Sequence, residues 1–242
     1  MLERFNTQQF ITEAKTNSLN KICDIYSPEL YFHGTARFGP VSTYTPEDED
    51  FFLINTPKDP NMDRLRSSFK YGIVSRSFTN RIRVPYSSNF GDHDSYGKIS
   101  LTRGENDPLL WAASYGIIGA TRFDANVKIS VEDVFVFIVS KSLKTEPLDG
   151  DEFRRKLRVR QKDFEGIVFL DGENTPAGQI PGRSSVDFNS ASHEEIIDTI
   201  TTEMLDVYRD RPELAIPIYG ISGDLYWPKR VSYEEIKQGR IN

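Results

Sequence analysis

The chain has 242 residues, of which 38% are hydrophobic and 27% charged, a composition that excludes disordered, collagen-like and coiled-coil proteins. The formal net charge of −6 argues against a nucleic-acid partner. No apolar run reaches 18 residues and the N-terminal segment lacks an apolar core, so we expect no transmembrane helix, no membrane partner and no cleaved secretory signal.

Hydrophobic periodicity predicts the elements of the chain. Residues 6–25 place apolar side chains at near-helical spacing, so we expect an N-terminal helical region over 1–27 that packs on the rest of the domain. The run 134–139 is apolar throughout, which is typical of a central strand. Ser192 and Glu195 form a capping-box pattern that predicts a helix start. The other expected elements are strands over 30–33, 71–75, 96–102, 165–170 and within 214–226, helices over 62–70 and 108–115, and a long loop over 80–95.

The order of these elements predicts one domain over residues 1–242. Strands and helices interleave without regular βαβ alternation, and no repeat or linker divides the chain, so the expected fold class is α+β. The single cysteine, Cys23, excludes an internal disulfide and is expected to be a small buried side chain. The three histidines, His33, His93 and His193, lie far apart in sequence, so no metal site is expected.

The common nucleotide and hydrolase motifs are absent from the sequence. There is no GxGxxG after a strand, no GxxxxGK[ST] and no GxSxG, so neither a Rossmann site, a P-loop nor a nucleophile elbow is indicated.

Five segments occur in a characteristic order: YFHGT at 31–35, YGIV at 71–74, YGKIS at 96–100, WAASY at 111–115 and FVFIV at 135–139. This ordered set resembles the ADP-ribosyltransferase superfamily, which includes NAD-consuming toxins and poly- and mono-ADP-ribosyl polymerases. The resemblance implies a split β-sheet core with flanking helices, and NAD as substrate.

The resemblance also implies roles for individual residues. The backbone of Gly34 would bind the nicotinamide carboxamide, since glycine has no side chain to block the approach. His33 would hydrogen-bond a ribose hydroxyl, Ser100 would support the carboxamide or the catalytic carboxylate, and Tyr115 would stack on the nicotinamide. Thr35 and Gly72 complete the NAD-contacting set.

Each of these residues also has a structural interpretation. His33 can be a strand-end histidine whose ring is satisfied by backbone groups, and Tyr115 can be a core tyrosine of an amphipathic helix. Ser100 can be an ordinary polar residue of a strand.

A glutamate is required to oppose the positive charge that develops when the nicotinamide–ribose bond breaks. The resemblance places this glutamate at the start of a late strand. Glu213, which follows a polar turn and opens the run 213–217, is the preferred candidate. Glu165, which opens the run 165–169, and Glu195, whose capping-box position indicates a helix start, are the alternatives.

The expected function is that of an NAD-dependent mono-ADP-ribosyltransferase, a glycosyltransferase acting as a bacterial effector or toxin on a host protein. The residue two positions before Glu213 is Arg211, whereas arginine-modifying toxins carry an acidic or amide residue there, so a non-arginine acceptor is expected. The alternatives are an NAD glycohydrolase and a catalytically inactive interaction domain of the same fold. The site of action would be the host cytoplasm, or the cytoplasm of the producing cell.

Overall fold

A computed structural model describes the parts of the chain discussed below. These are residues 30–37, 41–43, 52–54, 63–75, 98–103, 112–113, 129–130, 133–149, 152–170, 186–187 and 192–238. The expected N-terminal helical region over 1–27, the loop over 80–95 and Tyr115 lie outside the described residues.

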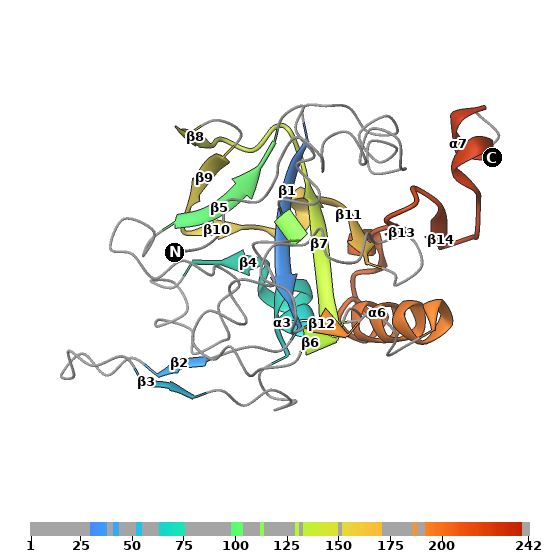
Figure 1. Ribbon diagram of the computed structural model, residues 1–242, viewed down its shortest axis with the longest axis horizontal. Helices are drawn as coiled ribbons and strands as arrows, with labels where there is room; N and C mark the ends of the chain where they lie inside the picture. Colours follow the sequence, from blue (N-terminus) through green and yellow to red (C-terminus); the bar gives the residue numbers. More distant parts are fainter. Residues whose placement is uncertain are drawn as a thin grey trace.

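The described residues form a mixed α and β structure that is mostly sheet, which confirms the α+β class at this level (Figure 1). The main sheet has eight strands in the order β14-β13-β11-β7-β1-β5-β9-β8. Its strands are β1 (Tyr31–Ala36), β5 (Lys98–Thr102), β7 (Val134–Val139), β8 (Glu146–Asp149), β9 (Glu152–Lys156), β11 (Phe164–Phe169), β13 (Ile218–Gly220) and β14 (Leu225–Trp227).

Short pairs of strands and a few helices complete the described structure. The pairs are β2 (Val41–Thr43) with β3 (Phe52–Ile54), β4 (Ile73–Val74) with β10 (Arg158–Val159), and β6 (Ile129–Ser130) with β12 (Val186–Asp187). The helices are α3 (Arg64–Tyr71), α6 (His193–Val207) and α7 (Tyr233–Lys237), with 3-10 turns η4 (Gln161–Asp163) and η5 (Pro212–Leu214). None of the described helices is long and apolar enough to cross a membrane.

The strand β7 lies near the middle of the sheet, as its apolar sequence predicts. All six of its residues are buried, and it pairs antiparallel with β1 on one side and β11 on the other. The two registers place His33, Phe137 and Ile167 in one row across three strands. Residues in such a row share a face of the sheet, so β7 fixes which side chains of β1 and β11 face the core.

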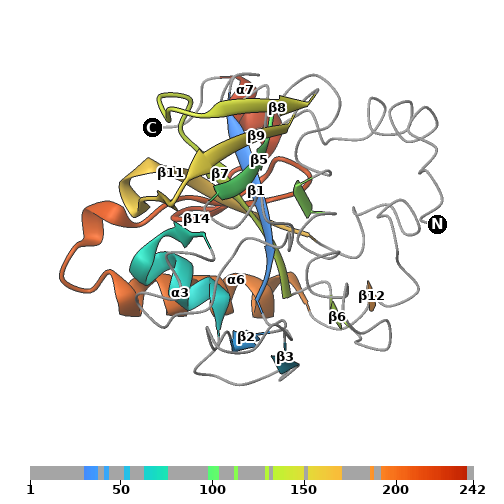
Figure 2. The ribbon, with the colours of Figure 1, turned by 90° about the vertical axis from the view of Figure 1, so that its left-hand side faces the viewer.

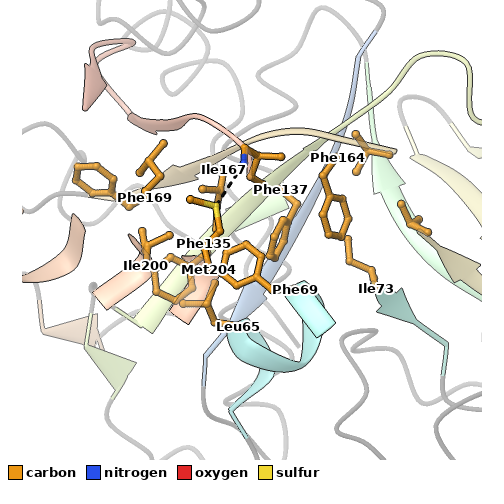
Figure 3. Packing of buried hydrophobic residues seen from close by; sticks show 14 of the residues in the cluster. Leu65, Phe69, Ile73, Phe135, Phe137, Phe164, Ile167, Phe169, Ile200 and Met204 are labelled. Atoms are coloured by element: carbon orange, nitrogen blue, oxygen red, sulfur yellow. Dashed lines mark hydrogen bonds between the residues drawn. The ribbon is translucent and has the colours of Figure 1, made fainter. Parts of the chain in front are cut away.

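The helices α3 and α6 cover one face of the sheet and enclose the core (Figure 2). Figure 3 shows Phe135, Phe137 and Phe169 of the sheet packed against Phe69 of α3 and Met204 of α6. The backbone N–H of Ile216 donates to the Met204 sulfur at 3.4 Å, which fixes the chain entering β13 onto α6. Because β11 and β13 are parallel neighbours, α6 forms the crossover that joins them.

The pairing between β1 and β5 is limited to one registered pair, Phe32 with Thr102. By contrast, β1 pairs with β7 at six positions and β5 with β9 at five. The antiparallel register would next place His33 opposite Leu101 and then Gly34 opposite Ser100, and neither pair is formed. The two strands therefore separate after Phe32.

Two expected strands differ from the observed structure. The helix α3 continues through Tyr71, so the strand expected from residue 71 begins at Ile73. Gly72 ends the helix with φ +79°, a conformation that favours glycine, and its N–H donates to the Ser68 carbonyl at 2.8 Å. The strand region expected over 214–226 consists of the turn η5 followed by the two short strands β13 and β14.

The capping box of α6 gives a test of the fold that is independent of function. The Glu195 carboxylate accepts a hydrogen bond from the Ser192 N–H at 2.8 Å, and this bond is the main reason its pKa lies below the usual value. We expect Ser192→Ala to cost about 1 kcal/mol of unfolding free energy near neutral pH. A carboxyl with a lowered folded-state pKa contributes stability above its unfolded pKa and loses it as the pH falls through the folded one.

The Glu195 carboxylate also accepts a hydrogen bond from the Ser192 hydroxyl at 3.0 Å, and alanine removes this bond but keeps the backbone one. The part of the stability difference between wild type and Ser192→Ala that comes from the hydroxyl bond should therefore be lost on acidification, as measured by urea denaturation at about pH 7 and about pH 3. Thr202→Ala, on an exposed position of the same helix, is the matched control and should show no such pH dependence. A difference that stays constant between the two pH values would contradict the capping account.

Candidate nucleotide site

His33 lies in β1 and is buried, with 4% of its surface exposed. Its Nδ1 lies 2.9 Å from the Ser100 carbonyl oxygen of β5. Since a carbonyl only accepts, Nδ1–H is the donor. His33 thus connects β1 and β5 beyond their one registered pair. This bond is the backbone contact expected under the structural interpretation of His33.

Gly34 is in unusually close contact with the segment 112–113. A Cβ atom added to Gly34 would lie 1.6 Å from the Ala112 carbonyl oxygen and 2.9 Å from the Ala113 nitrogen. These neighbours are backbone atoms, so they do not move aside as a side chain would. Only glycine fits this position, and the motifs at 31–35 and 111–115 meet there.

The polar backbone groups of Gly34 point toward β5. The Thr102 hydroxyl on β5 donates to the Phe32 carbonyl at 3.4 Å, so the Phe32 carbonyl faces β5. Alternate residues of a strand present their N–H and C=O groups to the same edge, which places those of Gly34 on the β5 side. The strands have separated at that level, so these groups face the opening between β1 and β5.

Ser100 contributes a hydroxyl without a partner in the described part of the structure. Its Oγ is buried and makes no hydrogen bond there. The Phe32–Thr102 pair puts Ser100 on the same face of the sheet as Gly34, opposite to the face of Ile99 and Leu101 in the core. Buried hydroxyls without a partner are uncommon in folded proteins, and each calls for an explanation. A ligand that hydrogen-bonds Ser100 in the opening would provide one.

Thr35 and Gly72, two other residues of the expected NAD-contacting set, have structural roles. Thr35 is fully buried, and its hydroxyl donates to the Ala36 carbonyl at 3.3 Å. A Cβ atom on Gly72 would lie 2.1 Å from the Val159 carbonyl oxygen, so this glycine is required by the packing of α3 on β10 as well as by its positive φ. Tyr115 lies outside the described residues, so its expected stacking role stays a prediction.

The prediction that Glu213 opens a strand is wrong. Glu213 lies in the turn η5, which Pro212 starts, and the next strand begins only at Ile218. Proline is favoured at the first position of a helical turn, which explains the difference from the apolar run read as strand. The Glu213 carboxylate is exposed and accepts from Arg211 Nε at 3.5 Å. The strand it precedes lies three positions from β1 in the sheet.

Glu165 occupies the position in a strand that was expected for the catalytic glutamate. It is the second residue of β11, exposed, and lies at a β-bulge between Phe164 and Gly166. Bulges are frequent beside active sites, where they redirect a side chain. Gly166, Ile138 and Phe32 form one row across β11, β7 and β1, so Glu165 lies two strands from β1 at the level of Phe32. Glu195 is held in the capping box of α6, as its sequence pattern indicates.

A buried arginine beside Ser100 was not singled out from the sequence. Arg154 of β9 is registered with Ser100 of β5 and is 9% exposed. The signal in the sequence is the basic run RRKLRVRQK at 154–162 in an otherwise acidic chain. Only the strand register shows which of these cations lies beside Ser100.

Among the described residues, no group of three or more His, Cys, Asp and Glu side chains forms a metal-binding cluster. Comparison with protein-family models, curated proteins and solved structures gives no match to this chain. The site is therefore interpreted from its own geometry.

Proposed function

We propose that this chain is an NAD-dependent mono-ADP-ribosyltransferase, which breaks the nicotinamide–ribose bond of NAD and transfers one ADP-ribose to an acceptor protein. The observation that carries the proposal is the buried hydroxyl of Ser100 at the opening between β1 and β5, which has no hydrogen-bond partner among the described residues. Gly34, whose backbone groups face the same opening, lies on the same face of the sheet. The split between β1 and β5 is the feature that we equate with the split core of the superfamily.

The role proposed for each residue follows from the chemistry of cleaving the nicotinamide–ribose bond. The Gly34 N–H and C=O match the acceptor and donor of the nicotinamide carboxamide, and the Ser100 hydroxyl adds a further hydrogen bond. His33 is assigned to a ribose hydroxyl, as the resemblance implies, and its Nδ1–H, donated to the Ser100 carbonyl, holds the ring between β1 and β5. A carboxylate then stabilises the oxocarbenium-like transition state. We assign this role to Glu165, because it lies at the start of a late strand whereas Glu213 lies in a turn.

The type of residue expected as the ADP-ribose acceptor depends on which glutamate is catalytic. The residue two positions before Glu165 is Asp163, an acidic residue of the kind that arginine-modifying toxins carry at this position. The Asp163 carboxylate accepts from the Arg160 N–H at 3.2 Å and so caps the turn η4. Because this carboxylate has a structural partner, we retain a non-arginine acceptor. Mapping of the modified residue by mass spectrometry tests the choice of acceptor.

We also retain a role as a bacterial effector in the cytoplasm of a host cell.

The direct test is incubation of the purified protein with NAD and a cell lysate, followed by measurement of released nicotinamide and of the intact mass of lysate proteins. A lysate protein that gains one ADP-ribose supports the proposal. Nicotinamide release without a modified protein would indicate an NAD glycohydrolase. Neither binding nor consumption of NAD would contradict the enzymatic proposal and favour an interaction domain.

The variant Ser100→Ala distinguishes a role of this hydroxyl in NAD cleavage from a role in the stability of the fold. Loss of one hydrogen bond to the substrate should lower kcat/KM about fivefold, whereas removal of an unsatisfied buried hydroxyl should leave stability unchanged or raise it. The measurements are NAD consumption and urea denaturation of the same samples. The matched control is Thr201→Val in α6, which removes another buried hydroxyl that has no hydrogen-bond partner in the described part of the chain, and it should leave NAD consumption unchanged. A Ser100→Ala protein that is less stable yet fully active would contradict this role.

A further inference from the structure

Hydrogen bonds join several cations into one surface where β9 leads through β10 into η4 (Figure 1). The Arg155 guanidinium donates from Nη1 to the Lys144 carbonyl at 2.9 Å and from Nε to the Arg158 carbonyl at 3.4 Å. Arg158 Nη2 donates to Gln161 Oε1 at 3.0 Å, and Gln161 Nε2 donates to the Lys70 carbonyl at 2.6 Å. These bonds bring together cations from α3, from the segment before β8, from β9 and from β10.

This surface carries more positive than negative charge. We define the basic patch as Lys70, Lys144, Arg155, Arg158, Arg160 and Lys162. Leaving Arg158 aside, none of these cations takes part in an ion pair among the described residues. The Asp163 carboxylate, which accepts from the Arg160 N–H at 3.2 Å, lies beside them. Five cations against one carboxylate leave a local charge of +4, and nearby Lys141 and Glu165 add one charge of each sign.

The acidic residues of β8 and β9 lie on the other face of the sheet. Glu146 of β8 is registered with Arg154 of β9. Asp149 is likewise registered with Glu152. Arg155 alternates with these residues along β9 and lies opposite a core residue of β5. The sheet therefore separates the basic patch from these carboxylates.

An exposed leucine lies within the patch. Leu157 joins β9 to β10, and 45% of its surface is exposed. Its φ is +64°, in the left-handed region that bulky side chains avoid. The turn is held there by the Ser75 N–H, which donates to the Leu157 carbonyl at 2.9 Å, and by the bond from Arg155 to the Arg158 carbonyl. The fold thus presents an apolar side chain between two cations, in a conformation that glycine would adopt at lower cost.

The combination of fixed cations and an exposed leucine matches an acidic polypeptide. Guanidinium and ammonium groups form charge-assisted hydrogen bonds with carboxylates, and Leu157 offers an apolar contact that a phosphate backbone does not use. The formal net charge of −6 repels a long polyanion such as a nucleic acid, whereas a short acidic segment contacts the patch alone.

We propose that the basic patch and Leu157 form a docking surface for an acidic segment of a partner protein, with an apolar side chain of that segment against Leu157. The Arg155 guanidinium is held in place by carbonyl oxygens, which carry no net charge, so its charge is available to the carboxylates of the partner. This inference is independent of the NAD proposal.

The test is fluorescence anisotropy of the full chain with a fluorescein-labelled peptide of one leucine flanked by glutamates. Arg155→Gln should raise the Kd about fivefold and Lys144→Gln about twofold, since each variant loses a charge-assisted contact with the peptide. Leu157→Gly should raise the Kd about threefold through the lost apolar contact. It should also raise the urea midpoint, because glycine relieves the positive φ. Lys144 is exposed, so its variant reports on the patch even where Arg155→Gln does not fold.

Matched controls come from α6 and the turn that follows it. Arg209 is exposed, and its Nη2 donates to Asp206 Oδ1 at 2.8 Å, so Arg209→Gln removes the same charge from an ion pair outside the patch. Leu205 is 43% exposed in α6, so Leu205→Ser controls for loss of an exposed leucine. Both variants should leave the Kd unchanged. A peptide with glutamine in place of glutamate should not bind, and higher salt should weaken binding of the acidic peptide.

Four outcomes would overturn all or part of the inference. No change in anisotropy up to about 1 mM peptide would reject the docking surface. Equal effects of Arg155→Gln and Arg209→Gln would reject it as well, since the charge would then act without regard to its place. Unchanged affinity in Leu157→Gly would reject the role of the leucine. Binding of the wild type to phosphatidylserine vesicles but not to the peptide, weakened by the same variants, would replace the protein partner with an anionic lipid surface.

Discussion

Replacing Glu165 by glutamine should lower the rate of NAD cleavage by about 10²- to 10³-fold, the usual cost of losing one group that stabilises transition-state charge. Glutamine keeps the size of the side chain but not its negative charge, so it cannot oppose the positive charge on the ribose. Glu165 is exposed in β11, so the substitution should leave the unfolding free energy within about 0.5 kcal/mol of wild type. Nicotinamide release and urea denaturation measure the two effects.

The same experiment with Glu213→Gln and Glu195→Gln decides among the three glutamates. Glu213 is exposed in η5 beside Arg211, and its variant should cleave NAD at close to the wild-type rate. Glu195→Gln should alter stability through the cap of α6 rather than the rate. Glu194→Gln, at the exposed neighbouring position, is a control for loss of one negative charge. A large loss of rate in Glu213→Gln with little effect in Glu165→Gln would reverse the assignment.

Replacing Gly34 by alanine should have the largest effect on stability. The added methyl group would lie 1.6 Å from the Ala112 carbonyl oxygen, so β1 and the segment 112–113 would have to separate. We expect a cost of about 3 kcal/mol or more, at the upper end of the range for overpacking. For a protein of this size a loss of that order is a large part of the total stability.

Gly166→Ala is the matched control for this substitution. Its Cβ atom would meet the Ile138 side chain at 3.1 Å and the Tyr219 ring at 3.3 Å, which are contacts that small side-chain movements relieve. Its cost should be about 1 kcal/mol or less. Urea denaturation of both variants at one pH gives the comparison. Equal stabilities of the two variants would show that the contact between Gly34 and Ala112 does not constrain the fold.

Local sequence signals predicted the elements whose formation depends on local interactions. The apolar run 134–139 became the buried central strand, and the capping pattern at Ser192 became the start of α6. The helix expected over 62–70 was found as α3, with its end displaced by the glycine that terminates it. In each case the deciding interactions lie within a few residues of one another along the chain.

Features that depend on distant contacts were not predicted. The resemblance implies a split sheet, but it did not identify β1 and β5 as the strands that separate, because the pairings of β1 with β7 and of β5 with β9 join residues far apart in the chain. Arg154 could not be distinguished from its basic neighbours until the register placed it opposite Ser100. The strand expected at Glu213 was wrong because Pro212 begins a turn, and the apolar residues that follow favoured the strand interpretation. The split core, the bound NAD and the acceptor stay predictions.

The pairing of β1 also has a consequence during synthesis of the chain. The register joins Tyr31 to Val139, so the first strand of the sheet waits for a partner that is translated more than a hundred residues later. At ordinary rates of translation this delay lasts about 5 to 20 s. Throughout that interval an apolar strand with unpaired edges would be exposed to other chains. Such a nascent chain would be a natural client of ribosome-associated chaperones, and its folding would be slow compared with that of proteins dominated by local contacts.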